Sequence, residues 1–99
     1  MANVIPNAFK GELLSGTHNF ASGGNSFKLA LYTSNPYTTS STAYDTTNEV
    51  SASGGSNYTT TGLVLQNQSV TTGATSFVDF DDLTFSSATF TAAFGAIYN

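Results

Sequence analysis

The spacing of apolar residues predicts one helix, over residues 6–18. Phe9 and Leu13 lie four positions apart, so they share one face of a helix and form a narrow apolar stripe. The side-chain oxygen of Asn3 or Asn7 is placed to cap the first turn, a role that asparagine often has. We therefore expect a short amphipathic helix at the N-terminal end of the chain.

Beyond this helix, the alternation of apolar and polar residues predicts strands. The clearest strand covers residues 27–33, in which Phe27, Leu29 and Leu31 share one face. A final strand is expected over residues 89–98. Because both of its faces are partly apolar, we expect it to lie centrally or against a neighbour. Four shorter stretches complete the pattern, over residues 62–66, 69–72, 76–80 and 83–85.

The number and spacing of these strands indicate the fold class. Short strands about ten residues apart are typical of sandwiches and barrels, so we predict an antiparallel β-sandwich, jelly-roll-like, with one short N-terminal helix. We expect a single domain over residues 1–99, in which residues 1–25 form a helical arm and turn. Residues 37–61 form a long polar loop, and such loops in compact domains are usually functional or disordered.

The composition separates a folded β-domain from a disordered chain. Serine, threonine, asparagine and glycine dominate, as they do in many disordered segments, but the chain also has eight phenylalanines and five tyrosines. Only 8% of the residues are charged, and threonine, tyrosine and phenylalanine favour strands. A domain of this size buries only ~60–65% of its unfolded surface, so we expect partner surfaces to add to its stability.

The charge and the missing residue types exclude several classes of protein. With two Lys or Arg residues against six Asp or Glu, the net charge is −4, whereas nucleic-acid binding requires cations that replace phosphate counterions. No apolar run approaches the ~20 residues of a membrane span, and no signal peptide is visible. The absence of cysteine excludes disulfides and thiolate metal sites. We therefore predict neither a nucleic-acid partner nor a membrane partner.

Three carboxylates close together are the most site-like feature. Asp79, Asp81 and Asp82 could bind Ca²⁺ through their oxygens. Their spacing does not match the twelve-residue EF-hand loop, which also requires a glycine and a distal glutamate. A strand end whose solvated acids mark a turn is therefore the favoured interpretation. The three residues remain weak metal candidates, and we predict no cofactor.

His18 is the only histidine and so the natural candidate for a general base. A catalytic histidine requires a nucleophile or substrate group within reach, and usually a carboxylate that orients it. No local spacing supports such an arrangement, so we favour a histidine at the helix end that contacts the last carbonyl groups. We therefore predict no catalytic residue and no enzymatic activity.

Several short motifs resemble a family of small virion proteins of tailed bacteriophages. The motifs are NAFKGELL (7–14), SFKLALYT (26–33), TNEV (47–50), NYTTTG (57–62), FVDFDD (77–82) and AIYN (96–99). The resemblance covers nearly the whole chain and implies a capsid cement or decoration protein with a jelly-roll-like β-sandwich. It also implies further strands after residue 99. We therefore expect a shorter fold, strands supplied by a neighbouring subunit, or a trimmed form.

The resemblance leads to an expected function and partner. We expect a cement protein that binds the outer surface of the major capsid protein lattice as a dimer or trimer. It would be assembled in the cytoplasm of the bacterial host and then reside on the virion. The alternatives are a tail, baseplate or fibre component of the virion, and a carbohydrate-binding module.

Aromatic and apolar side chains are the expected partner contacts, because such anchors often dominate interface energies. For each of them, ordinary core packing is the alternative. The expected contact residues are Phe9, Leu13, Tyr37, Tyr44 and Tyr58.

Overall fold

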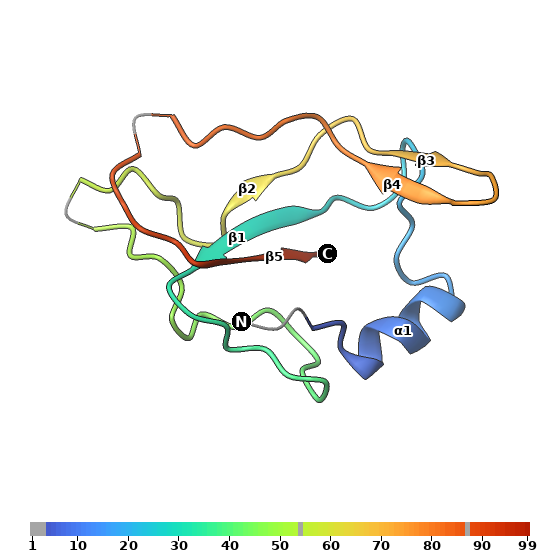
Figure 1. The fold of residues 1–99 in the computed structure, drawn as a ribbon, viewed down its shortest axis with the longest axis horizontal. Helices are drawn as coiled ribbons and strands as arrows, with labels where there is room; N and C mark the ends of the chain where they lie inside the picture. Colours follow the sequence, from blue (N-terminus) through green and yellow to red (C-terminus); the bar gives the residue numbers. More distant parts are fainter. Residues whose placement is uncertain (1–3, 54, 87) are drawn as a thin grey trace.

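Antiparallel strands make up most of the regular structure, with one short helix beside them (Figure 1). The computed structural model describes residues 4–53, 55–86 and 88–99. Its elements are α1 (Asn7–Leu14), β1 (Lys28–Tyr32), β2 (Leu63–Val64), β3 (Ser69–Thr71), β4 (Phe77–Asp79) and β5 (Phe94–Tyr98).

A three-stranded sheet with the order β2-β1-β5 forms the centre of the molecule. β1 pairs with β5 from Lys28 opposite Tyr98 to Tyr32 opposite Phe94. On its other side β1 pairs with the short β2, and an isolated bridge from Tyr32 to Glu49 extends this pairing. Both sides of β1 are therefore occupied, and β1 is the central strand.

The final strand is shorter than its prediction. β5 begins at Phe94, although the alternating pattern predicted a strand from residue 89. It lies at one end of the sheet order, paired with β1. The physical reason is the partner: β1 has only five residues, and its ladder with β5 ends where β1 ends. The expected strand over residues 83–85 is irregular in the structure.

β3 and β4 form a separate two-stranded sheet, in which Val70 lies opposite Val78. All six of its strand residues are exposed to solvent. A two-stranded hairpin alone is only marginally stable in water, so it depends on what it packs against. The described residues therefore establish a mainly antiparallel β chain with one helix and two small sheets, and the sandwich stays a prediction.

The helix is shorter than the sequence predicted. It ends at Leu14, where Ser15 donates its backbone N–H to the carbonyl of Gly11. Gly16 then adopts a φ of +75°, the left-handed conformation with which glycine often ends a helix. At the other end Pro6 is the N-cap, without a side-chain cap, so the predicted cap by Asn7 is wrong. The alternative cap, Asn3, lies outside the described residues.

The core of the described structure is small. Its buried hydrophobic residues are Phe27, Ala30, Tyr32, Val50, Tyr58 and Leu65. The radius of gyration is 14.4 Å, against about 13 Å for a compact chain of this length. A small core and an extended shape both leave apolar side chains on the surface.

Candidate functional site

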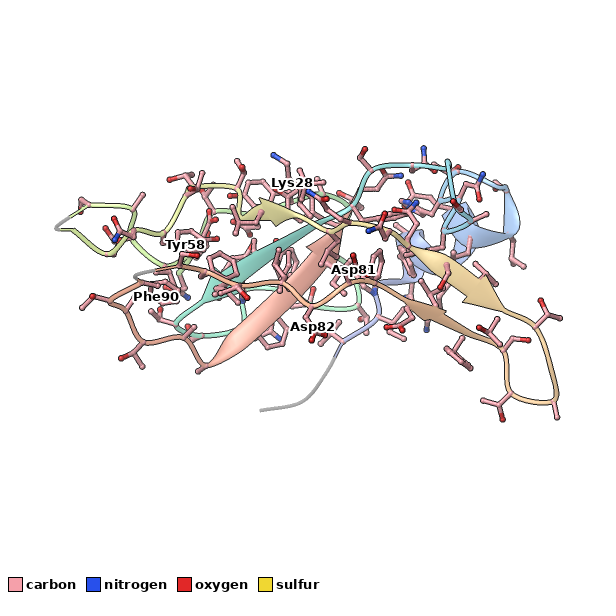
Figure 2. All side chains as sticks on the ribbon, turned by 90° about the horizontal axis from the view of Figure 1, so that it is seen from above. Lys28, Tyr58, Asp81, Asp82 and Phe90 are labelled. Carbon is pink, nitrogen blue, oxygen red and sulfur yellow. The ribbon has the colours of Figure 1, made fainter. Side chains whose placement is uncertain are left out.

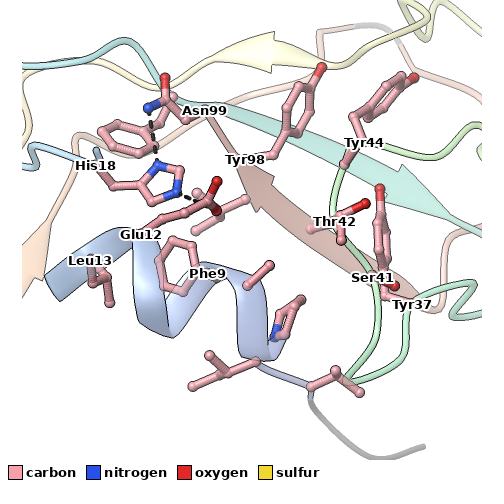
Figure 3. A pocket seen from close by; sticks show the side chains of 18 of the residues that line it. Phe9, Glu12, Leu13, His18, Tyr37, Ser41, Thr42, Tyr44, Tyr98 and Asn99 are labelled. Carbon is pink, nitrogen blue, oxygen red and sulfur yellow. Dashed lines mark hydrogen bonds and ion pairs between the residues drawn. The ribbon is translucent and has the colours of Figure 1, made fainter. Parts of the chain in front are cut away.

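A groove of about 880 Å³ lies between α1 and β5 (Figure 3). Phe9 and Leu13 of the helix line one side, and β5 lines the other along its whole length. Tyr37 and residues 41–44 of the long loop close one end. A groove of this volume is within the range of pockets that hold a ligand.

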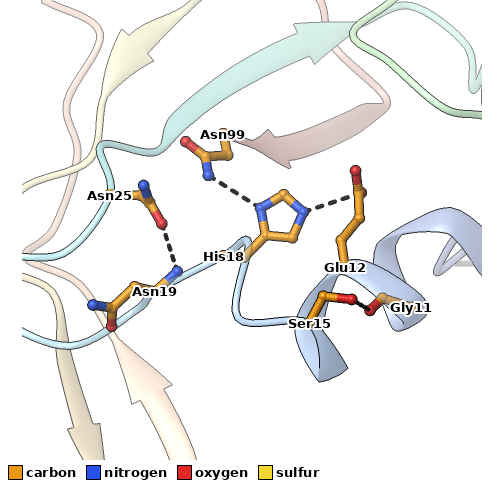
Figure 4. A network of polar contacts seen from close by, with 7 residues as sticks. All are labelled: Gly11, Glu12, Ser15, His18, Asn19, Asn25 and Asn99. Atoms are coloured by element: carbon orange, nitrogen blue, oxygen red, sulfur yellow. Dashed lines mark hydrogen bonds and ion pairs between the residues drawn. The ribbon is translucent and has the colours of Figure 1, made fainter.

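Hydrogen bonds at both ends hold the helix beside the sheet. At the N-terminal end of α1, the backbone N–H of Asn7 donates to the carbonyl of Thr39 at 2.9 Å. Beyond the C-terminal end, Asn99 lies 3.1 Å from Nδ1 of His18, and Nε2 of the same ring lies 3.2 Å from the carboxylate of Glu12 (Figure 4). The groove is therefore framed by contacts made within the chain.

The predicted contact of His18 with the last carbonyl groups of the helix is wrong. The ring bonds the Glu12 and Asn99 side chains and not the last helix carbonyls, and it lies 4.8 Å from the Phe9 ring. A neutral imidazole with its proton on Nε2 donates to Glu12 and accepts from the Asn99 amide. Both ring nitrogens therefore have side-chain partners within the chain. The arrangement favours a positioning role for this histidine.

The pairing of β1 shows which of its backbone groups face β5. Val50 donates its N–H to the carbonyl of Leu31, and Leu65 donates its N–H to the carbonyl of Phe27. The carbonyls of these odd-numbered residues therefore point away from β5. Since backbone groups alternate along a strand, the even-numbered residues of β1 bond to β5.

The outer edge of β5 follows from this alternation. Ala30 of β1 lies opposite Ala96, so Ala96 and its even-numbered neighbours turn their backbone groups toward β1. The N–H and C=O groups of Gly95 and Ile97 then point away from β1, toward the outer edge of the sheet. No strand of the described residues pairs with them there. Both residues line the groove, and the Ile97 side chain is 53% exposed. One side of the groove therefore offers free backbone donors and acceptors.

Glu49 connects the long loop to the sheet. Its carboxylate accepts hydrogen bonds from the Tyr44 hydroxyl, from the Tyr58 hydroxyl at 2.5 Å and from the Thr61 N–H at 3.0 Å. Burial raises the pKa of both tyrosines, and the hydrogen bond to the carboxylate raises the pKa further. Both hydroxyls therefore stay protonated and act as donors. No pattern in the sequence predicted this cluster, whose only local signal is one acid among threonines and tyrosines.

The structure brings four of the five predicted contact residues to the groove. Phe9, Leu13, Tyr37 and Tyr44 line it, and Tyr44 also stacks on Tyr98 at a centroid distance of 4.6 Å. Tyr58 does not line the groove. It is 3% exposed and packs in the interior near the C-terminal end of β1, far from α1 (Figure 2). Lining a groove is not yet contact with a partner, so the partner role of these residues stays a prediction.

The acidic cluster is engaged locally. Asp81 accepts a hydrogen bond from the Asn67 side chain at 2.6 Å, and Asp79 accepts one from the N–H of Phe80. Figure 2 shows Asp81 and Asp82 on the segment that leaves β4. Over residues 4–53, 55–86 and 88–99, no group of three His, Cys, Asp or Glu side chains could hold a metal ion. In the same residues no helix is long and apolar enough to span a membrane.

Several large apolar side chains lie on the surface. Leu14 at the end of α1 is 92% exposed, and Phe77 of β4 is 52% exposed. Val70 and Val78, which face each other in the β3–β4 hairpin, are also exposed. These residues, together with the groove, form the surface that a partner protein would find most favourable to cover.

Comparison of the chain with protein-family models, with curated proteins and with solved structures found no match. The resemblance to phage virion proteins therefore stays a prediction.

Proposed function

We propose that the chain is a capsid cement protein of a tailed bacteriophage, which binds the outer surface of the major capsid lattice and stabilises the head. The proposal joins two kinds of support. The short motifs along the sequence resemble phage virion proteins, and the surface of the folded chain is suited to binding other protein. The observation that carries it is the exposed apolar surface on α1, β5 and the β3–β4 hairpin.

Covering this surface would stabilise both the subunit and the lattice. Full burial of one leucine or phenylalanine side chain contributes roughly 1.5–3 kcal/mol, and Leu14 and Phe77 are each more than half exposed. With 8% charged residues, few ions lose their hydration in such a contact. Subunits that each touch several neighbours on one lattice gain further strength, because their contacts engage together.

The proposed function includes an oligomeric state and a place of assembly. The protein works as a dimer or trimer on the virion after assembly in the bacterial cytoplasm. A jelly-roll-like β-sandwich is the proposed complete architecture, to which the three-stranded sheet and the β3–β4 hairpin contribute the antiparallel strands.

The test is a reconstruction, by electron microscopy, of virions whose genome encodes the chain. Density for the chain is expected on the outer face of the icosahedral head. Density on the tail would instead favour the alternative of a tail, baseplate or fibre component, and virions without the chain would overturn both.

A functional readout complements the images. Heads that lack the protein should release DNA at a lower temperature than complete heads, and added purified chain should restore the higher temperature. Equal release temperatures would contradict a stabilising role even if the chain were present on the head.

A further inference from the structure

We propose that the groove between α1 and β5 takes an extended segment of a partner protein, apolar along its length and carrying one basic residue, which adds to β5 as a new strand. This inference rests on the proposed role as a subunit that binds other protein. It goes further in naming the site and the chemistry of the segment that fills it.

The edge of β5 supplies the main-chain part of the site. Gly95 and Ile97 present N–H and C=O groups along the groove, at the spacing with which an antiparallel or parallel neighbour would bond. An extended peptide that pairs with them would be recognised in the mode known as strand addition. β5 has five residues, so it can pair with a segment of about five residues, ~17 Å long.

The lining of the groove supplies the apolar preference. Successive side chains of an added strand point to opposite faces, and those that lie next to α1 would contact the apolar lining of the groove. There they would meet Phe9 and Leu13, with Val4 and Phe20 nearby in the same lining. Apolar side chains of the partner would therefore leave water at this surface.

Charge complementarity supplies the basic residue. Glu12 lines the groove with its side chain 45% exposed, and no lysine lines the groove among the residues that the structure describes. The Glu12 carboxylate contacts Nε2 of His18 at 3.2 Å, and Nδ1 of the same ring lies 3.1 Å from the Asn99 amide. A lysine or arginine of the partner would therefore find a carboxylate without a competing permanent cation.

The same charges disfavour a second copy of the chain as the occupant. Two copies joined edge to edge through β5 would bring together two chains of net charge −4. Each copy has only Lys10 and Lys28 as permanent cations, and Lys28 already donates to the hydroxyl of Thr61. A partner of different sequence therefore fits the groove better than the chain itself.

A selection experiment tests the proposal with a defined probe. Immobilised full chain is panned against a library of random heptapeptides, and the most enriched sequence is synthesised together with a version in which its basic residue is glutamate. Enrichment of alternating apolar residues with one lysine or arginine is expected. In ¹⁵N spectra of the chain, this peptide should shift the amide signals of Gly95 and Ile97, and the glutamate version should bind at least about threefold more weakly.

Two variants separate the main-chain and the charge contributions. Ile97→Pro removes an outward N–H without removing a bond to β1, and it should weaken peptide binding about tenfold, whereas Ile97→Val should not. Glu12→Gln should abolish the preference for the basic residue. Asp82→Asn, which removes the same charge outside the groove, should leave that preference unchanged.

The inference would be overturned by no enriched peptide, by shifts at another surface with Gly95 and Ile97 unaffected, or by binding that is indifferent to Glu12→Gln. Concentration-dependent shifts of the same two amides without peptide would assign the edge to a second copy, which also overturns it. Its failure differs from failure of the proposed function. A chain seen on the head with a free β5 edge would reject only the groove, and peptide binding by a chain absent from virions would reject only the cement role.

Discussion

The carboxylate of Glu49 accepts a hydrogen bond from the hydroxyl of Tyr58 at 2.5 Å, across nine positions of the long loop. The backbone of Glu49 forms the bridge to Tyr32 of β1, and the Tyr58 hydroxyl also accepts from the N–H of Leu31. The pair therefore joins two parts of the loop to the central strand. These bonds fix the long loop against β1 although its described residues contain no regular strand.

Replacing this carboxylate should destabilise the fold. Glu49→Gln keeps the size of the side chain but leaves one oxygen to serve the donors of Tyr44, Tyr58 and Thr61. We expect the free energy of unfolding, measured in urea, to fall by about 2 kcal/mol, because hydrogen bonds to charged groups contribute more than neutral ones. Glu12→Gln, at the half-exposed end of the groove, should change it by less than about 1 kcal/mol. Equal effects of the two substitutions would contradict the role of Glu49.

Because of Tyr44 and Tyr58, the free energy of unfolding should fall at alkaline pH. Burial, followed by the hydrogen bond to Glu49, raises the pKa of Tyr44 and Tyr58 above the ordinary value of 10.0. Above pH 10 the unfolded chain loses protons that the folded chain retains, so stability is complete below that pH and falls as pH rises further. Absorbance of the tyrosinate should therefore increase together with unfolding. Ionisation of both residues near pH 10 in a chain that stays folded would count against the buried cluster.

Among the glycines that the structure describes, Gly62 is the one whose replacement should be most damaging. Its φ is +82°, and a Cβ at this position would lie 1.9 Å from the carbonyl oxygen of Leu29. Gly62→Ala should therefore lower the free energy of unfolding by about 3 kcal/mol or more. Gly11→Ala is the matched control, because its site in α1 has no atom within 4 Å, and it should stabilise the chain by roughly 0.5–1 kcal/mol. Thermal melts of the two variants should move in opposite directions.

Local patterns predicted some elements well and others only in part. β1 lies one residue inside its predicted range at each end, because its alternation is strong. The helix was predicted to continue to residue 18, but it ends at Leu14, just before the left-handed turn at Gly16. The predicted strand over 89–98 alternates throughout, yet only its second half finds a partner strand. Pairing depends on a neighbour, which a local pattern does not contain.

The candidate site could be predicted only through its apolar and aromatic residues. Phe9 and Leu13 were recognised because they form a stripe. By contrast, the contact between Asn99 and His18 joins positions 81 residues apart, and no spacing rule connects them. The outward direction of Gly95 follows from the register of β1 and β5, which requires the fold. Sequence therefore identified the helix side of the groove and two tyrosines of the loop at its end, and the tertiary structure supplied the β5 side.

The exposed end of α1 gives the sharpest test of binding to the head. Leu14 is the last helical residue and is 92% exposed, so it contributes little to the folded chain itself. Leu14→Ser should therefore change the free energy of unfolding by no more than about 0.5 kcal/mol. On the head, loss of a buried leucine should weaken binding about tenfold or more, since its burial contributes roughly 1.5–3 kcal/mol. Cosedimentation of purified variants with heads that lack the protein measures this difference.

The control variant is Lys10→Ser, which places the same residue at another exposed position of the helix. It should bind nearly as well as the unchanged chain. If Leu14→Ser binds as strongly as the unchanged chain, the end of α1 lies outside the interface. If Lys10→Ser proves equally weak, the loss is a general effect of altering the helix and not of removing an apolar contact.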